Sequence, residues 1–193
     1  HCEMGQGIHT ALAMMAAEEM DADWSLVQVK EAPALDEYAN GYIVRAFAGD
    51  SVPAPFERGF DYVTYRLMRI AGLQMTGGST STRSTGRFGM TIAGAAARQM
   101  LIGAGAAKFG VNASECTAQN SHVVHTASGR SATFGELASA AAKLPVPTTP
   151  ALKDANRYTI RSPPPPRPDL HSNVLGSATS VIALPAPGVF SRP

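Results

Sequence analysis

The feature that most constrains this fold is a run of very small side chains inside a stretch of helical character from residue 89 to residue 108. Residues 93–97 read Ala-Gly-Ala-Ala-Ala, and a second small group, Gly-Ala-Gly, follows at 103–105. A helix with so little side-chain volume lets a neighbouring backbone approach closely. We therefore expect a thin, closely packed central helix. Gly110 is expected to end it in the left-handed conformation typical of a C-terminal cap.

Composition excludes several classes of protein. The 193 residues carry a net charge of +1, from 16 Lys and Arg against 15 Asp and Glu, which argues against a nucleic-acid partner. Charged residues make up 16%, below the roughly 25% of typical soluble domains. No apolar run approaches the roughly 20 residues of a transmembrane helix. Cys2 and Cys116 fit no C-x-x-C metal spacing and are expected to be separate thiols, with a single disulfide as the alternative.

The hydrophobic pattern predicts further helices and strands along the chain. Helices are expected at 8–20, 57–70 and 134–143, strands at 26–30, 122–125 and 158–160, and loops at 33–56 and 77–86. Glu18, Glu19 and Asp21 give the first of these helices a polar end. Thr133 and Glu136 are spaced as a capping box for the last. These elements together predict an α+β fold.

One candidate site is the segment Gly5-Gln6-Gly7, directly before the helix expected at 8–20. Two glycines let the backbone turn sharply and present the amide side chain beside the N-terminus of the helix. That end of a helix favours an anion or a metal-oxo group, and a Gln side chain both donates and accepts hydrogen bonds. The alternative is a tight turn with a capping Gln.

A second candidate site is the segment Gly77-Gly78-Ser79-Thr80-Ser81. Glycine backbone and hydroxyl groups can cradle a phosphate, and two arginines follow at positions 83 and 87. The segment is neither a P-loop nor a Rossmann fingerprint, because the Gly-Lys-Ser/Thr ending and a G-x-G-x-x-G after a strand are both absent. The alternative is a flexible surface loop.

The histidines do not predict a metal centre. His122 and His125 would lie on opposite faces of a strand, which is poor geometry for one metal ion. His9 follows Gln6 by about one helical turn, so its side chain faces either the same pocket or the helix surface. We therefore predict no metal-ligating side chains in this chain.

Taken together, the motifs resemble one family of enzymes. Residues 3–10, Glu-Met-Gly-Gln-Gly-Ile-His-Thr, look like the first pterin-site motif of the molybdenum-binding large subunit of the xanthine dehydrogenase and aldehyde oxidase superfamily. Later pieces resemble the branch of the isoquinoline 1-oxidoreductase beta subunit and the membrane-associated aldehyde dehydrogenases. These pieces lie at 17–24, 74–81, 93–98, 128–130 and 135–137. The resemblance runs from residue 3 to roughly residue 170.

The resemblance implies an oxidoreductase subunit with a molybdopterin cytosine dinucleotide cofactor, which oxidises an aldehyde or an N-heterocycle with water-derived oxygen. It implies a catalytic role for Gln6, hydrogen-bonded near the oxo group of the metal, and it makes Gly5, Gln6 and Gly7 cofactor-binding residues. It places the second segment against the pterin dinucleotide, with contacts from Gly77, Gly78, Ser79, Thr80 and Ser81. Electrons would leave through a separate 2Fe-2S small subunit and, in the aldehyde dehydrogenase branch, reach a cytochrome c subunit.

The resemblance also implies a domain organisation. Residues 1–150 would be part of a molybdopterin-binding domain of mixed sheet and helices, followed by a Pro-rich linker at 151–170. Residues 171–193 would be the truncated start of a β-rich domain, ending in an irregular Pro-rich tail. The segment 41–72 is longer than in many members, so it is either an insertion at the cofactor mouth or a partner surface.

The catalytic base of the family is a Glu near the C-terminus of a much longer chain, and neither Glu3 nor Glu136 is assigned that role. We therefore expect an N-terminal fragment of the subunit that does not turn over alone. The alternative is an inactive fragment that serves only as a cofactor-binding or subunit-interaction module. The periplasmic side of the inner membrane and the cytoplasm both remain open as locations.

Overall fold

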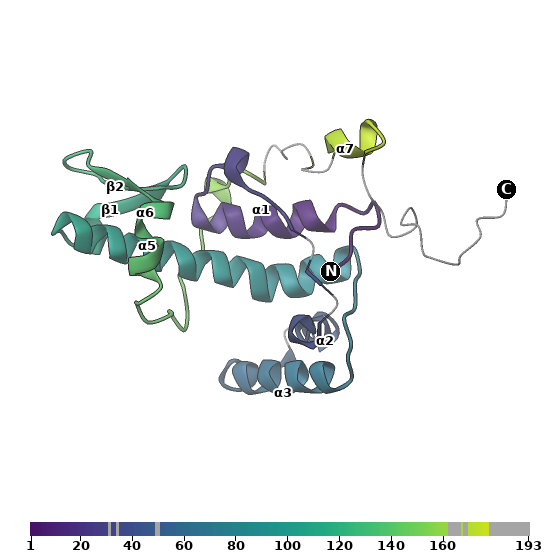
Figure 1. The fold of residues 1–193 in the computed structure, drawn as a ribbon. Coiled ribbons are helices and arrows are strands. Elements are labelled where there is room, and N and C mark those ends of the chain that lie inside the picture. The colour runs from purple at the N-terminus through teal and green to yellow at the C-terminus, as the bar shows by residue number, and fades with distance from the viewer. Residues whose placement is uncertain (31, 34, 49–50, 162–166, 168–169, 178–193) are drawn as a thin grey trace.

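Two long helices, α1 (Ile8–Met20) and α5 (Thr91–Phe109), lie side by side at the centre of the molecule (Figure 1). The structure is a computed structural model that describes residues 1–30, 32–33, 35–48, 51–161, 167 and 170–177. A small sheet and α6 pack around the C-terminal half of α5, whereas α2 and α3 lie near its start. This arrangement confirms the predicted α+β class. None of the helices in the described ranges is long and apolar enough to cross a bilayer.

The contact between α1 and α5 depends on the absence of a side chain at Gly94. A Cβ atom built on Gly94 would lie 2.5 Å from the carbonyl oxygen of Ala16, which no real side chain tolerates. The predicted central helix is thus confirmed, and so is its end, because Gly110 has a φ of 69° in the left-handed region.

A three-stranded antiparallel sheet forms the second half of the core. Its strands are β1 (Cys116–Gln119), β2 (His122–His125) and β3 (Ser131–Thr133), in that order. Val123 on β2 is fully buried and packs so closely on α5 that a Cβ at Gly105 would lie 2.6 Å from its Cγ1 atom. Only β2 was predicted, because it contains two adjacent valines, whereas β1 and β3 each bury a single small residue.

Helix α6 (Phe134–Ala141) begins at the predicted capping box. The hydroxyl of Thr133 accepts a hydrogen bond from the backbone N–H of Glu136, and the Glu136 carboxylate accepts one from the N–H of Thr133. Leu137 on α6 is buried against α5 and the sheet. The capping-box prediction is therefore confirmed.

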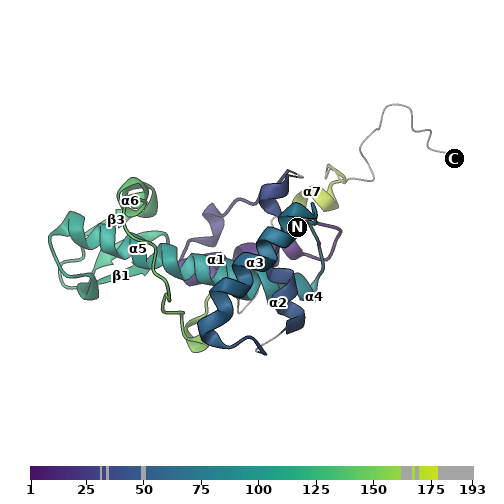
Figure 2. The same ribbon diagram turned by 90° about the horizontal axis from the view of Figure 1, so that it is seen from below.

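Helices α2 (Tyr42–Ala48) and α3 (Glu57–Ile70) form a separate layer near the start of α5, and α3 is the outermost element on the side seen in Figure 2. The buried Arg45 on α2 pairs with Glu57 at 3.1 Å and Asp61 at 3.2 Å on α3. Helix α3 was predicted. The loop predicted at 33–56 is wrong over α2, where burial of Ile43 and Arg45 stabilises a helix.

The loop predicted at 77–86 is also wrong from residue 79 onward. Helix α4 (Ser79–Ser81) continues into the π-helical segment η5 (Thr82–Met90), which leads into α5 without a break. The Ser84 hydroxyl donates to the carbonyl of Thr80 at 2.8 Å, so a residue typical of loops is satisfied inside a helix. Gly86 faces Met15 of α1 with no room for a side chain.

The remaining short helices are single turns or little more. They are η1 (Trp24–Leu26), η2 (Asp36–Tyr38), η4 (Ala54–Phe56), η6 (Ala113–Glu115), η7 (Ala155–Arg157) and α7 (Leu170–Val174). The predicted strands at 26–30 and 158–160 are not formed, because no strand in the described ranges lies beside either. The prolines at 163–166 and the tail from residue 178 lie outside the described residues.

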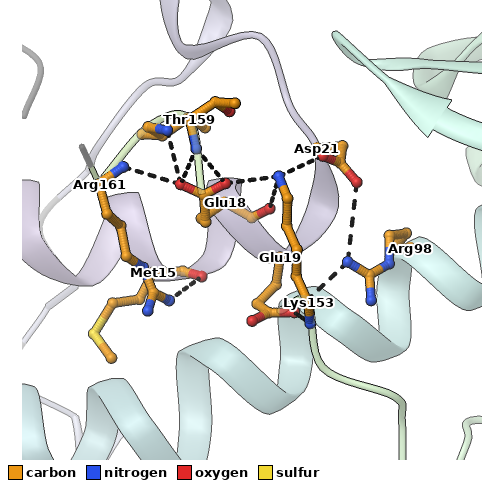
Figure 3. Close-up of polar contacts among 9 residues, drawn as sticks. Met15, Glu18, Glu19, Asp21, Arg98, Lys153, Thr159 and Arg161 are labelled. Atoms are coloured by element: carbon orange, nitrogen blue, oxygen red, sulfur yellow. Dashed lines mark hydrogen bonds and ion pairs between the residues drawn. The ribbon is translucent and has the colours of Figure 1, made fainter. Parts of the chain in front are cut away.

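Residues 151–161 are fixed to α1 by a buried carboxylate (Figure 3). Glu18 is fully buried and accepts a hydrogen bond from Lys153 Nζ at 2.7 Å. It also accepts hydrogen bonds from the backbone N–H groups of Thr159, Ile160 and Arg161. These N–H groups belong to the predicted strand at 158–160 or directly follow it, so the carboxylate takes the place of a neighbouring strand.

A second buried carboxylate, Glu19, lies next to Glu18 and faces α5. The group Glu18, Glu19, Asp21, Arg98 and Lys153 is called the ion cluster below. The Oε2 atom of Glu19 accepts the backbone N–H of Lys153 at 2.9 Å and lies 3.6 Å from Nη1 of Arg98. Asp21 joins the two cations, 2.6 Å from Lys153 Nζ and 3.9 Å from Arg98 Nη1. The polar end predicted for α1 is therefore buried at Glu18 and Glu19 rather than solvated.

The ion cluster keeps Glu18 and Lys153 charged. Burial raises the pKa of Glu18, but the hydrogen bonds from Lys153 and from three backbone N–H groups outweigh it and hold the pKa below its usual value of 4.5. Burial lowers the pKa of Lys153, and hydrogen bonds to Asp21 and Glu18 reverse this and raise it above 10.5.

We expect Glu18→Gln to lower the free energy of unfolding by about 3–5 kcal/mol near neutral pH, as for other broken buried ion pairs. Because the folded pKa of Glu18 lies below 4.5, its carboxylate stabilises the fold fully above that pH, and this is lost as the pH falls through the folded pKa. The difference between variant and wild type should therefore shrink below pH 4.5 in urea unfolding series. Equal losses for Glu18→Gln and the exposed Glu37→Gln near neutral pH would contradict the role of the cluster.

We expect Gly94→Ala to lower the free energy of unfolding by about 1–3 kcal/mol, because the new methyl group forces α1 and α5 apart. Gly103→Ala in the same helix is the matched control. Its methyl group would meet only the end of the Leu144 side chain, at 3.1 Å, and would gain up to about 1 kcal/mol of helix propensity. Urea unfolding of both variants measures the difference, and equal stability would show that the close approach is not required.

Candidate functional site

The two glycine segments singled out in the sequence lie side by side in the structure. A Cβ atom on Gly78 would lie 3.9 Å from Cγ of Gln6, with nothing closer. The backbone N–H of Cys2 donates to the hydroxyl of Thr76 at 3.0 Å, and the His1 ring lies 2.9 Å from the hydroxyl of Thr85. The chain end marked N in Figure 1 accordingly lies beside the helical segment that leads into α5.

Glu3 organises the first segment. Its Oε1 atom accepts the N–H groups of Gly5 at 2.9 Å and Gly7 at 2.8 Å, and its Oε2 atom accepts that of His9 at 3.2 Å. Gly5 and Gly7 have φ values of 92° and 75°, which favour glycine. The carboxylate of Glu3 therefore occupies the N-terminal end of α1, where the sequence suggested an external anion.

The charge on Glu3 is itself stabilised by its surroundings. Burial raises the pKa of Glu3, but the three backbone hydrogen bonds and the nearby Arg167 guanidinium outweigh it, so the pKa lies below 4.5. Arg167 Nη2 lies 3.5 Å from the carboxylate, and Nη1 donates to the carbonyl of Gly5 at 3.0 Å. Sequence reasoning missed this role of Glu3, although its position two and four residues before the glycines was a usable signal.

The Gln6 side chain is exposed, and its amide forms hydrogen bonds with the backbone of the same turn. Its Oε1 atom accepts the N–H of Met4 at 2.6 Å, and its Nε2 atom donates to the carbonyl of Cys2 at 3.0 Å. The amide thus has a fixed orientation, on the surface that faces Gly78. The cap of α1 is Glu3 rather than Gln6, so the alternative of a capping Gln is not what the structure contains.

The second segment divides into a supporting and an accessible part. The Ser81 hydroxyl is fully buried and accepts the N–H of Gly77 at 2.8 Å. Gly78 and Ser79 are exposed, and Thr80 is half-buried. The accessible residues stand at the first turn of the continuous helical segment that runs to Phe109, where the backbone dipole favours negative charge.

The histidines serve separate local contacts. His125 is buried, 2.7 Å from the hydroxyl of Ser128 and 3.3 Å from a carboxylate oxygen of Glu115. His122 lies 2.7 Å from the carbonyl of Asn120, and His9 contacts the carbonyl of His1 at 2.9 Å. Within the described ranges, no group of three or more His, Cys, Asp or Glu side chains could hold a metal ion. Cys2 and Cys116 form no disulfide with each other.

Comparison with known proteins gives two relatives, while no family model matches the chain. The chain is 33% identical over 191 residues to the isoquinoline 1-oxidoreductase subunit beta of Brevundimonas diminuta, covering 94% of this chain and 20% of that protein. It is 33% identical over 135 residues to a membrane-bound aldehyde dehydrogenase (pyrroloquinoline-quinone) of Gluconacetobacter polyoxogenes, covering 70% of this chain and 13% of that protein. The chain thus spans a fifth or less of the length of these relatives.

Proposed function

The chain belongs to the branch of oxidoreductases that includes the isoquinoline 1-oxidoreductase beta subunit, and we propose that it forms one side of a molybdopterin cytosine dinucleotide site in such a subunit. The observation that carries the proposal is the meeting of the segments around Gln6 and Gly78. They are separated by about seventy residues of sequence, and each was identified independently as a candidate ligand site.

The residues of this surface fit a pterin dinucleotide. A pyrophosphate needs several N–H and hydroxyl donors with little side-chain volume around them. Gly78, Ser79 and Thr80 offer these at an accessible helical start. Ser81 would support the turn from below, through its hydrogen bond with the N–H of Gly77, and would not touch the ligand.

Gln6 would hold the reacting end of the cofactor. Its amide is exposed and lies next to Gly78. Nε2 carries two hydrogens and donates one to the carbonyl of Cys2, so the other can donate to an oxygen ligand. The cofactor would supply the redox centre that takes two electrons from the substrate. The role of this chain would be to orient that centre and to donate a hydrogen bond to it.

As part of the proposal, the substrate class follows from the names of the relatives, and the partners follow from the resemblance of the sequence motifs. We infer an aldehyde or an N-heterocycle as substrate, a 2Fe-2S subunit as electron acceptor, and in the aldehyde dehydrogenase branch a cytochrome c beyond it. The family base would lie in a part of the subunit beyond these 193 residues, so this chain alone would not turn over.

The alternative is an inactive cofactor-binding or subunit-interaction module. One observation favours it: Glu3 already engages the N–H groups of Gly5 and Gly7, and the amide of Gln6 is hydrogen-bonded within its own turn. A turn whose polar groups already bond to one another can serve a structural role alone, without forming one side of a cofactor site.

Analysis of the intact purified subunit distinguishes these functions. The proposal requires molybdenum and a cytosine nucleotide, released by acid, in near-stoichiometric amounts. Pyrroloquinoline quinone, which the name of the second relative mentions, would be detected by its absorbance after extraction. Its presence without molybdenum, or the absence of both cofactors from an otherwise active enzyme, would contradict the proposal.

We expect Gln6→Ala in the intact subunit to lower turnover about 100-fold, the usual effect of removing one donor to a developing oxyanion. Cofactor content should remain within about twofold, because the dinucleotide is held mainly by the second segment. Steady-state kinetics and metal analysis of the same preparation measure both effects. Parallel loss of turnover and molybdenum would show that Gln6 acts only through the shape of the turn.

We expect Gly78→Ala to lower cofactor content several-fold without lowering the thermal unfolding midpoint. The fold has room for this methyl group, whose nearest neighbour is Gln6 Cγ at 3.9 Å. A ligand in contact with Gly78 would clash with it. Gly59→Ala on α3 is the matched control, since its methyl group meets nothing within 4 Å. Full cofactor content in Gly78→Ala would exclude close contact between this glycine and the cofactor.

A further inference from the structure

Leu26–Lys30, of which Leu26 is the last residue of η1, keeps the burial pattern of a β-strand although no strand in the described ranges lies beside it. Val27 and Val29 are half-buried, whereas Leu26, Gln28 and Lys30 are exposed, so burial alternates with the period of two that defines a strand. Val27 is extended, with φ −77° and ψ 124°. The prediction of a strand here is wrong for the structure, yet the burial of the side chains keeps the alternation of a strand.

The backbone of this segment offers an open edge. Across the described part of the chain, no backbone–backbone hydrogen bond reaches Gln28, Val29 or Lys30, and all three strands lie in the separate sheet around the end of α5. A row of exposed N–H and C=O groups on an extended segment is a template for pairing with another strand.

An apolar cavity of about 650 Å³ lies between this segment and α1. Leu12, Ala13, Ala16 and Met20 of α1 line one side, and all five residues of Leu26–Lys30 line the other. Because the cavity is lined chiefly by apolar groups, it suits apolar side chains better than a hydrated ligand. Helix α1 packs against α5, so the cavity marks a further face of α1 that is only partly covered.

We propose that a β-strand of the same enzyme subunit, outside these 193 residues, pairs with Leu26–Lys30 and packs its apolar side chains against α1. The length of the relatives supports this source, since the chain covers 20% and 13% of them. The paired strands would place α1 between a sheet and α5, so that both long faces of the helix are covered. The inference does not depend on which cofactor the subunit binds.

Hydrogen exchange of backbone amides tests the proposal without any substitution. In the 193-residue chain the amides of residues 28–30 should all exchange rapidly. In the intact subunit the amides that face the docked strand, either that of Val29 or those of Gln28 and Lys30, should exchange at least about 100-fold more slowly. The amide of Val123, in the paired strand β2, should be protected in both samples. Rapid exchange of all of residues 28–30 in the intact subunit would overturn the proposal. So would protection in the chain alone that rises with protein concentration, because a second copy would then be the partner.

A charge placed in the cavity provides the second test. We expect Ala13→Arg to leave the unfolding midpoint of the 193-residue chain within a few degrees of wild type, since the cavity is open. In the intact subunit the same change should lower the midpoint and the yield of folded protein, because Arg would displace the docked strand. The exposed Ala138→Arg on α6 is the control and should have no effect in either. Equal behaviour of the two variants in the intact subunit would contradict the docking of a strand.

Discussion

The close approach of α1 and α5 at Gly94 determines where the rest of the structure lies. With no side chain between the helices, the Ala16 carbonyl rests against the Gly94 backbone, and the first half of α1 extends along η5. This contact brings Met15 onto Gly86, and the turn that precedes α1 then meets the turn that precedes α4. The candidate site is therefore a consequence of helix packing. Gln6 lies just before α1 and Gly78 just before the helical segment that begins at Ser79, and small residues let these two helices come into contact.

The same geometry explains why two carboxylates can be buried one turn further along α1. Removing a charge from water is costly unless partners replace the lost solvation. Glu18 recovers it from an ammonium group and three backbone N–H groups. Glu19 recovers part from Arg98 of α5, which is within reach only because the helices are close. Burial of these charges specifies one position for residues 151–161, since a shifted segment would leave Glu18 without its donors.

Local signals in the sequence were sufficient for elements that local interactions determine. The helices at 8–20 and 57–70, the capping box at Thr133 and the glycine end of α5 all depend on neighbours within a few residues. The ion cluster could not be predicted, because Lys153 lies 135 residues from Glu18. Residues 79–86 were predicted as a loop because Ser, Thr and Gly usually avoid helices. In the structure the Ser84 hydroxyl bonds inside the helix and Gly86 fits against α1. In the candidate site, the glycine segments were visible in the sequence. The capping role of Glu3 was missed, although its spacing from Gly5 and Gly7 is a local signal.

A segment whose sequence pattern favours burial or strand pairing, but which no part of this structure covers or pairs with, indicates what kind of element binds there. Two such patterns remain here, the exposed row Val63, Leu67 and Ile70 on α3 and the alternating segment Leu26–Lys30. The row on α3 lies on an outer helix, and no feature of the described residues around it identifies what would bind there. The segment Leu26–Lys30 differs, because it combines an open backbone edge with an apolar cavity against α1. Backbone edges pair with strands and not with helices, so only this second pattern specifies both the place and the secondary structure of what it binds.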